Sequence, residues 1–380
     1  MELSDQDNLR LNVLLSQDLH AVRIDEADMS VHALTGRGEA RVSLNPTGRH
    51  EQYLRRVREL LSTHVLGSPG GYPIYLRRWT RMGQARDESL ARLLMLGEPE
   101  AVVAVVHAAG LTDELARRAW WAMPTADNAR CMLRRPEVAG GSMGPVLAEF
   151  LLDYLPFETE SGPVMESVGL VLQPGLIDEA ARDGLWAKAR RKNVYYVGFL
   201  FAVPDDLPAA AAPHPGAEAA EAALADLAGH GNACAAQLRR VLGAAGQGFL
   251  ATAEAVLAKP NDQDVALAVL EAIAAYFESV RPDAPDGGPD IEAILAEAAA
   301  RVRGAPEGSE LAAVRAAAPA LADELSAMLA LAAVGEPLVA PIFARTDAIG
   351  TVMRRRLEPV FGPVLEQLGR LRAGAVERRA

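Results

Sequence analysis

The feature that most constrains the fold is a succession of short amphipathic segments separated by glycine and proline. From residue 51 onward, apolar residues recur at helical spacing in units of roughly 12 to 15 residues. The punctuation includes Gly97 and Gly110 after apolar runs, and Thr112 and Thr125 before them, which are residue types that cap helix ends. One such stripe is too small to form a stable core alone, so neighbouring helices must stack in antiparallel pairs. We therefore predict a mainly α protein, either an irregular helical-repeat array (HEAT-like or armadillo-like) or a helical bundle array.

The residues before this array have a different character. Residues 20–45 contain short β-prone runs separated by polar turns, which predict a small N-terminal antiparallel β element. Residues 51–67, EQYLRRVRELLSTHVLG, then predict an amphipathic helix with Gly67 at its C-terminal cap. The helical array is expected over 51–203, with prolines and glycines lying between its helices and not inside them.

Composition also predicts two domains. Residues 204–217, PDDLPAAAAPHPGA, are rich in conformational breakers and indicate a linker between an N-terminal domain, 1–203, and an alanine-rich C-terminal helical domain, 218–380. Breaks are expected at 259–262, 281–290 and 303–309. Residues 262–281 place apolar side chains on one face, which predicts a buried seam. The alanine enrichment itself is given no functional weight.

Charge and cysteine content narrow the function class. The 380-residue chain is half apolar, and its 50 acidic and 38 basic residues give a net charge of −12, which disfavours broad binding to nucleic acid or anionic membranes. Two cysteines without CxxC spacing give no disulfide framework and no zinc-finger pattern. The longest apolar run, residues 194–203, is about half a membrane span. We expect a cytoplasmic protein without cofactor, metal or membrane partner.

One stretch, residues 64–83 (HVLGSPGGYPIYLRRWTRMG), departs from this acidic background. Between Tyr53 and Arg86 there are seven arginines and one acidic residue, Glu59. The glycines of this stretch could form an anion-binding nest, but no P-loop lysine or GxGxxG motif accompanies them. The candidate partner-binding residues here are Arg55, Arg58, Tyr72, Arg77, Arg78, Trp79, Arg81 and Arg86.

Three interpretations of this stretch remain open. The arginines can pair with acidic groups of their own chain, they can bind an acidic surface of another protein, or they can bind RNA or a small anion.

Two other motifs are weaker. GGSMG at 140–144 has the G-x-S-x-G pattern of a hydrolase nucleophile, but no strand is expected before Ser142, so a loop between helices is the better interpretation. His230 and Cys234 are spaced to share a helix face, yet no second pair of metal ligands is evident.

Cys131 and Trp120 complete the candidate residues. Cys131 lies near Arg130, Arg134 and Arg135, whose charge can lower a thiol pKa, and it is a weak candidate for carrying sulfur. Trp120 and its neighbour Trp121 point about 100° apart on a helix, so one of them is expected in an inter-helix groove or an interface unless a wide junction buries both.

Over residues 64–135, from HVLGSPGG to CMLRR, the chain resembles the DsrS family. Members of this family are cytoplasmic and accompany the dissimilatory sulfite reductase genes of sulfur-oxidising bacteria. The resemblance extends toward the N-terminus and fades in the alanine-rich half. It implies an accessory or regulatory role in sulfur oxidation and supplies no active-site residues.

These observations predict a non-catalytic adaptor or regulator that binds another sulfur-oxidation protein through the arginine and aromatic residues. Two alternatives remain: an RNA-binding post-transcriptional regulator using the same basic stretch, and a sulfur-transfer protein using Cys131.

Overall fold

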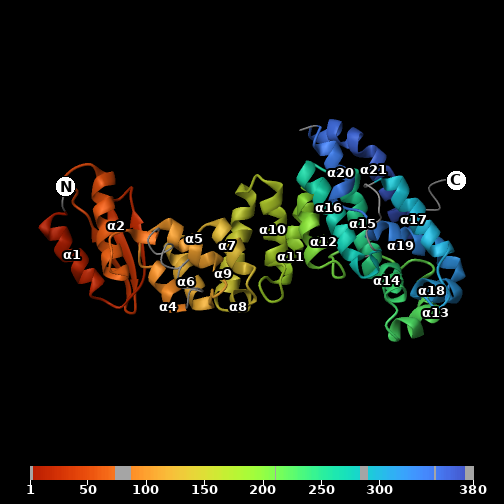
Figure 1. Cartoon of the computed structure of the whole chain (residues 1–380), viewed down its shortest axis with the longest axis horizontal. Coiled ribbons are helices and arrows are strands. Elements are labelled where there is room, and N and C mark those ends of the chain that lie inside the picture. Colours follow the sequence, from red (N-terminus) through yellow and green to blue (C-terminus); the bar gives the residue numbers. More distant parts are fainter. Residues whose placement is uncertain (1–2, 73–86, 210, 283–289, 346–347, 373–380) are drawn as a thin grey trace. The chain divides into compact units, whose positions relative to one another are not determined.

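The chain is mainly α-helical, with one small antiparallel sheet near its N-terminus, as predicted (Figure 1). The computed structural model describes residues 3–72, 87–209, 211–282, 290–345 and 348–372. Its contacts divide the chain into two compact units. The first contains residues 1–156 and 173–177, and the second contains 157–172 and 178–380.

The sheet has three strands in the order β1-β2-β3: β1 Leu19–Asp25, β2 Ser30–Thr35 and β3 Gly38–Ser43. Val31 of β2 pairs with Ile24 on one side and with Val42 on the other. Val31 and Ala33 of β2 are fully buried on one face, and Ser30 and Leu34 on the other face are buried as well, so this central strand is covered on both sides.

Two helices cover the face of this sheet that carries Val31 and Ala33: α1 Asp5–Leu15 and α2 His50–Leu66. Leu11 of α1, Val31 of the sheet, and Tyr53 and Leu61 of α2 belong to one hydrophobic core. Helix α2 ends at Gly67, which has a left-handed conformation (φ 70°), so the predicted amphipathic helix and its cap are confirmed.

The remaining helices of the first unit are short, and two of them, α6 and α7, begin at the predicted caps. Thr112 accepts a hydrogen bond from the Leu115 amide, and Thr125 accepts one from the Asn128 amide. The helices are α4 Asp87–Leu93, α5 Pro99–His107, α6 Asp113–Ala122, α7 Ala126–Leu133, α8 Pro136–Ala139 and α9 Met143–Tyr154, followed by the 3-10 turn η1 Leu155–Phe157.

All the secondary structure elements of the second unit, among its described residues, are helices. Its helices are α10 Ser161–Val171, α11 Glu179–Ala189, α12 Val194–Ala202, α13 Ala217–Gly229, α14 Ala233–Leu242, α15 Ala244–Ala258, α16 Gln263–Tyr276, α17 Ile291–Arg303, α18 Glu310–Ala317, α19 Ala322–Ala332, α20 Glu336–Phe343 and α21 Gly350–Leu371. Two 3-10 turns accompany them, η2 Glu278–Val280 and η3 Pro319–Leu321. The break expected at 259–262 lies between helices, and so does the one expected at 303–309, apart from Arg303 at the end of α17. Most of the break expected at 281–290 lies outside the described residues.

Helices pack repeatedly against their next-but-one neighbours. This holds for α7 with α9 in the first unit, and for α10 with α12, α17 with α19, and α19 with α21 in the second. Such contacts are typical of stacked helix layers, in which each layer buries the apolar stripe of the one before. The predicted seam of residues 262–281 is confirmed, since Val269 and Ile273 of α16 and Phe277 at its C-terminal cap are fully buried.

The expectation that prolines and glycines fall only between the helices of 51–203 is wrong, since Gly169, Gly184 and Gly198 lie in helix interiors. Glycine and proline also occupy the first turns of α9 (Gly144, Pro145) and α10 (Gly162, Pro163). Gly198 has a packing reason. A Cβ added there would lie 2.7 Å from the Val168 side chain and 2.8 Å from the Met165 carbonyl oxygen. The missing side chain therefore lets α12 approach α10 closely.

The segment predicted as an interdomain linker lies within the second unit instead of between units. This segment is irregular in conformation, but residues near both of its ends contact α14 of that unit. Arg240 forms an ion pair of 2.7 Å with Asp205, and the His214 amide donates to the Leu242 carbonyl. Breaker residues thus mark an irregular connection here, whereas the division of contacts falls near residue 156.

Candidate functional site

Three of the predicted partner-binding residues, Arg55, Arg58 and Tyr72, lie together in the first unit. They line a hollow of about 680 Å³. The other lining residues are Glu26, Glu59, Pro69, Gly70, Gly71, Glu98, Pro99 and Glu100. The predictions for Arg77, Arg78, Trp79, Arg81 and Arg86 fall outside the residues that the structure describes.

The described arginines of this stretch pair with carboxylates of the same chain. Glu59 lies between two of them, 3.3 Å from Arg55 Nε and 2.6 Å from Arg56 Nη1. Arg58 forms an ion pair with Glu26. These pairs favour the intramolecular interpretation for this part of the stretch, although Arg55 stays 80 % exposed.

Two backbone amides of the glycine turn are already occupied. The Gly71 amide donates to Ser62 Oγ at 2.7 Å, and the Tyr72 amide donates to Glu98 Oε2 at 2.9 Å. An anion-binding nest needs such amides to be free, and a carboxylate beside them repels a second anion. The described part of the turn therefore gives no support to the nest.

The two adjacent tryptophans of α6 diverge as predicted. Trp120 packs edge-to-face on Phe150 of α9, with ring centroids 4.8 Å apart. Trp121 faces the sheet, where its Nε1 donates to Glu39 at 2.7 Å and the Arg23 guanidinium lies over its ring. Both rings are half-buried in contacts of the first unit, so Trp120 serves a helix junction there.

Cys131 is a buried thiol of α7, 8 % exposed. Its Sγ lies 3.6 Å from the Val106 carbonyl oxygen and 3.5 Å from His107 Nδ1. The sequence did not predict the histidine, because His107 is 24 residues away. A thiol beside an imidazole can be activated, but burial withholds this one from a sulfur donor or acceptor of any size.

Ser142 lies in a connection between α8 and α9, with no strand before it, which agrees with the helix-to-helix loop. Its hydroxyl donates to Asp113 Oδ2 at 2.7 Å, and Asp113 also accepts from the amides of Ser142 and Met143 at 3.0 Å. Asp113 thus caps the start of α9 from a distant helix. Burial alone would raise its pKa, but these hydrogen bonds together lower it below the ordinary value.

His230 and Cys234 do not form a metal site. His230 is exposed and contacts Asp226 of its own helix, whereas the Cys234 side chain is buried. Burial, and secondarily the charge of Glu310, raises the pKa of the Cys234 thiol to about 11. Among the described residues, no group of three or more His, Cys, Asp or Glu side chains is placed to hold a metal ion.

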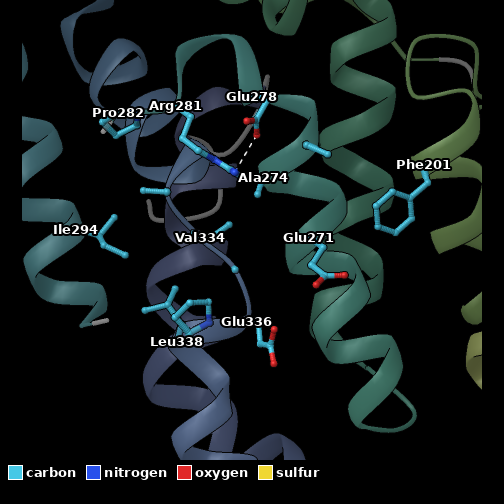
Figure 2. A pocket seen from close by; sticks show the side chains of 14 residues that line it. Phe201, Glu271, Ala274, Glu278, Arg281, Pro282, Ile294, Val334, Glu336 and Leu338 are labelled. Atoms are coloured by element: carbon cyan, nitrogen blue, oxygen red, sulfur yellow. Dashed lines mark ion pairs between the residues drawn. The ribbon is translucent and has the colours of Figure 1, made fainter. Parts of the chain in front are cut away.

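The second unit contains a groove of about 730 Å³ that the sequence did not predict (Figure 2). We call it the acid-rimmed groove. Its lining comes from α12, α16, η2 and the two residues after it, α17, the turn between α19 and α20, and the first turn of α20: Phe201, Glu271, Ala274, Ala275, Glu278, Arg281, Pro282, Ile294, Ala333, Val334, Gly335, Glu336, Pro337 and Leu338. Its volume lies within the range of ligand-binding pockets.

The floor of this groove is apolar. Ala274, Ile294, Val334 and Leu338 are each less than 9 % exposed and show only aliphatic surface. Small residues on both sides, among them Ala275 and Gly335, leave room above this floor because no bulky side chain fills it. The ring of Phe201, which also lines the groove, is 46 % exposed.

The rim carries more negative than positive charge. Figure 2 shows Arg281 reaching toward Glu278 at one end, where Nη1 and Oε2 are 3.0 Å apart. Glu271 and Glu336 reach into the space between α16 and the start of α20, and neither forms an ion pair with a described residue (Figure 2). The lining therefore holds two unpaired carboxylates beside apolar surface.

Part of the signal for this groove is present in the sequence. The alanine enrichment of the C-terminal half supplies the small side chains of the groove, and the helical spacing of α16 leaves Glu271 and Ala275 on its exposed side. A single sequence does not show that this side of α16 lies beside residues 333–338, about 60 positions later in the chain.

No described helix is by itself long and apolar enough to cross a membrane, although two bent pairs of consecutive helices reach the required length together. Comparisons with protein-family models, with curated proteins and with solved structures gave no match. The resemblance drawn from residues 64–135 therefore stays a prediction.

Proposed function

We propose that this protein is a non-catalytic adaptor that acts through protein–protein contacts. The observation that carries the proposal is the acid-rimmed groove, in which the exposed ring of Phe201 and an apolar floor lie beside two carboxylates that have no ion pair among the described residues. Exposed apolar surface of this kind is typical of interaction sites, because its burial against a partner is favourable and its exposure to water is not. The setting in dissimilatory sulfur oxidation comes from the resemblance to the DsrS family alone.

The adaptor proposal keeps the predicted function but changes the surface that best supports it. The described arginines of residues 53–86 lie beside glutamates, whereas Glu271 and Glu336 of the groove lack cationic partners among the described residues. The two rival functions have weaker support. RNA binding would need free guanidinium groups, and sulfur transfer would need an accessible thiol at Cys131.

Affinity purification of the tagged full-length chain from its own cells tests the adaptor proposal. We expect at least one protein to copurify in a constant ratio, with no chemical conversion needed to keep it bound. Two variants then compare the surfaces: Glu271→Lys with Glu336→Lys for the groove, and Arg77→Glu with Arg78→Glu and Arg81→Glu for the basic stretch. An absence of any stoichiometric partner would contradict the adaptor function. Loss of the partner only in the arginine variant would place the partner-binding site in the basic stretch.

A further inference from the structure

The occupant of the acid-rimmed groove must present both apolar and cationic groups. Its apolar side has to match the floor made by Ala274, Val334 and Leu338, where burial of apolar surface yields roughly 25 cal/mol per Å². Its cationic side has to meet Glu271 and Glu336. The chain as a whole has a net charge of −12, so the long-range field also favours a cationic partner.

The aromatic edge fits the same chemistry. Phe201 lies at the end of α12 with nearly half of its surface exposed, next to a groove lined by three carboxylates and one guanidinium. A partly exposed ring can receive an aliphatic side chain on its face, and it attracts lysine or arginine through the cation–π interaction. Aromatic residues, phenylalanine included, are enriched at protein interfaces.

Backbone hydrogen bonding selects the conformation of the occupant. The lining residues belong to helices and helix turns, so the groove offers no strand edge to which an extended peptide could add. A segment that loses its water here must satisfy its own amides and carbonyls. A helix does so internally.

We propose that the acid-rimmed groove binds a cationic amphipathic helix of a partner protein. Its apolar stripe lies on the floor and against Phe201, and its lysine or arginine side chains lie beside Glu271 and Glu336. This inference rests on the proposed adaptor function and names the chemistry of the partner.

A defined peptide tests the charge and the helix separately. The probe is a fluorescent peptide of about 14 residues, four helical turns, in which leucine and lysine are placed so that all leucines share one face. A second peptide has the same composition in an order that spreads the leucines around the helix. Binding to the full-length chain is measured by fluorescence anisotropy at low and at physiological salt.

We expect the amphipathic peptide to bind the wild-type chain. Its affinity for the Glu271→Lys, Glu336→Lys variant should be roughly tenfold lower, since two attractive charge pairs become repulsive. The control variant is Asp183→Lys with Glu218→Lys, which makes the same change in net charge at exposed positions outside the groove lining. It should bind nearly as wild type does. Phe201→Ala should also weaken binding, with less dependence on salt.

Three outcomes would overturn the inference. Equal weakening in the groove and control variants would show attraction by net charge alone. Equal binding of both peptides would show that helical amphipathicity is irrelevant. Unchanged binding in both the groove variant and Phe201→Ala would place the peptide elsewhere. If the copurifying partner of the adaptor test is retained by the groove variant, the adaptor function stands and only this inference fails.

Discussion

At the scale of single residues, Asp7 shows how a buried charge can hold two elements together. Its carboxylate accepts hydrogen bonds from the Tyr53 hydroxyl at 2.6 Å and from the Asn45 amide at 2.7 Å, so it joins α1 to α2 and to the chain after β3. Burial is the largest single influence and raises its pKa, but the hydrogen bonds from Tyr53, Asn45 and Ser4 together outweigh it. The pKa of Asp7 lies below its ordinary value of 3.8.

Because the folded pKa is lowered, Asp7 stabilises the fold at pH above the ordinary value, and this contribution disappears as the pH falls through the folded value. Asp7→Asn removes the charge and should lower the free energy of unfolding at pH 7 by about 1–3 kcal/mol. Urea denaturation at pH 7, 4 and 3 should show a deficit that is nearly constant above the ordinary value of 3.8 and shrinks below it. Asp5→Asn, an exposed position of the same helix, should have little effect. A deficit independent of pH would contradict this role.

The two thiols provide a second test at this scale. Cys131 is buried beside His107, and the raised pKa of Cys234 leaves about 100-fold less thiolate than an ordinary thiol gives. Both should react slowly with iodoacetamide in the native protein and fully after denaturation in guanidinium, as measured by mass spectrometry of the labelled peptides. Cys131→Ser isolates the response of Cys234. Rapid native labelling of Cys131 would instead restore the sulfur-transfer hypothesis.

At the scale of elements, the packing of α12 on α10 depends on one absent side chain. Gly198→Ala places a methyl group against Val168 and the Met165 carbonyl, so the helices must separate. We expect a loss of about 1–3 kcal/mol from overpacking. Gly184 in α11 is the matched control, since a Cβ there meets no atom within 4 Å. Gly184→Ala should therefore stabilise the protein by about 0.5–1 kcal/mol through helix propensity. Thermal denaturation of both variants measures the contrast, and equal shifts would refute this account of Gly198.

The helices were predictable because their signals are local. The caps at Thr112 and Thr125, the left-handed Gly67 and the breaks between C-terminal helices each depend on a few consecutive residues. The groove was not predictable, because residues as far apart in the sequence as Phe201 and Glu336 line it together. The pairing of Arg58 with Glu26 escaped prediction for the same reason, since 32 residues separate them.

At the scale of the whole molecule, the division into units follows contacts and not composition. Residues 204–217 contain the strongest breakers in the chain, yet α12, which precedes them, packs on α15 and α16, which follow them. The fully buried Phe199 belongs to α12. A cut at the predicted linker would therefore divide a hydrophobic core.

Two fragments test this division. Residues 157–380 correspond to the second unit, apart from 173–177, whereas residues 218–380 lack α12. We expect the longer fragment to unfold cooperatively on heating. The shorter one should bind more of a hydrophobic dye and should lose cooperativity, because α15 and α16 lose their cover. If residues 218–380 melt as sharply as the longer fragment, the predicted boundary at the linker is the better one.

The central claim is that the acid-rimmed groove holds a cationic amphipathic segment of a partner. Site-specific photocrosslinking in the protein's own cells tests it most directly, with a benzophenone amino acid at Phe201 and, as a control, at Val352, which is also exposed. The account predicts crosslinks from position 201 to one partner segment that has lysine or arginine beside an apolar helical stripe. Crosslinks from position 201 that match those from position 352, or that reach only acidic or non-helical segments, would contradict it.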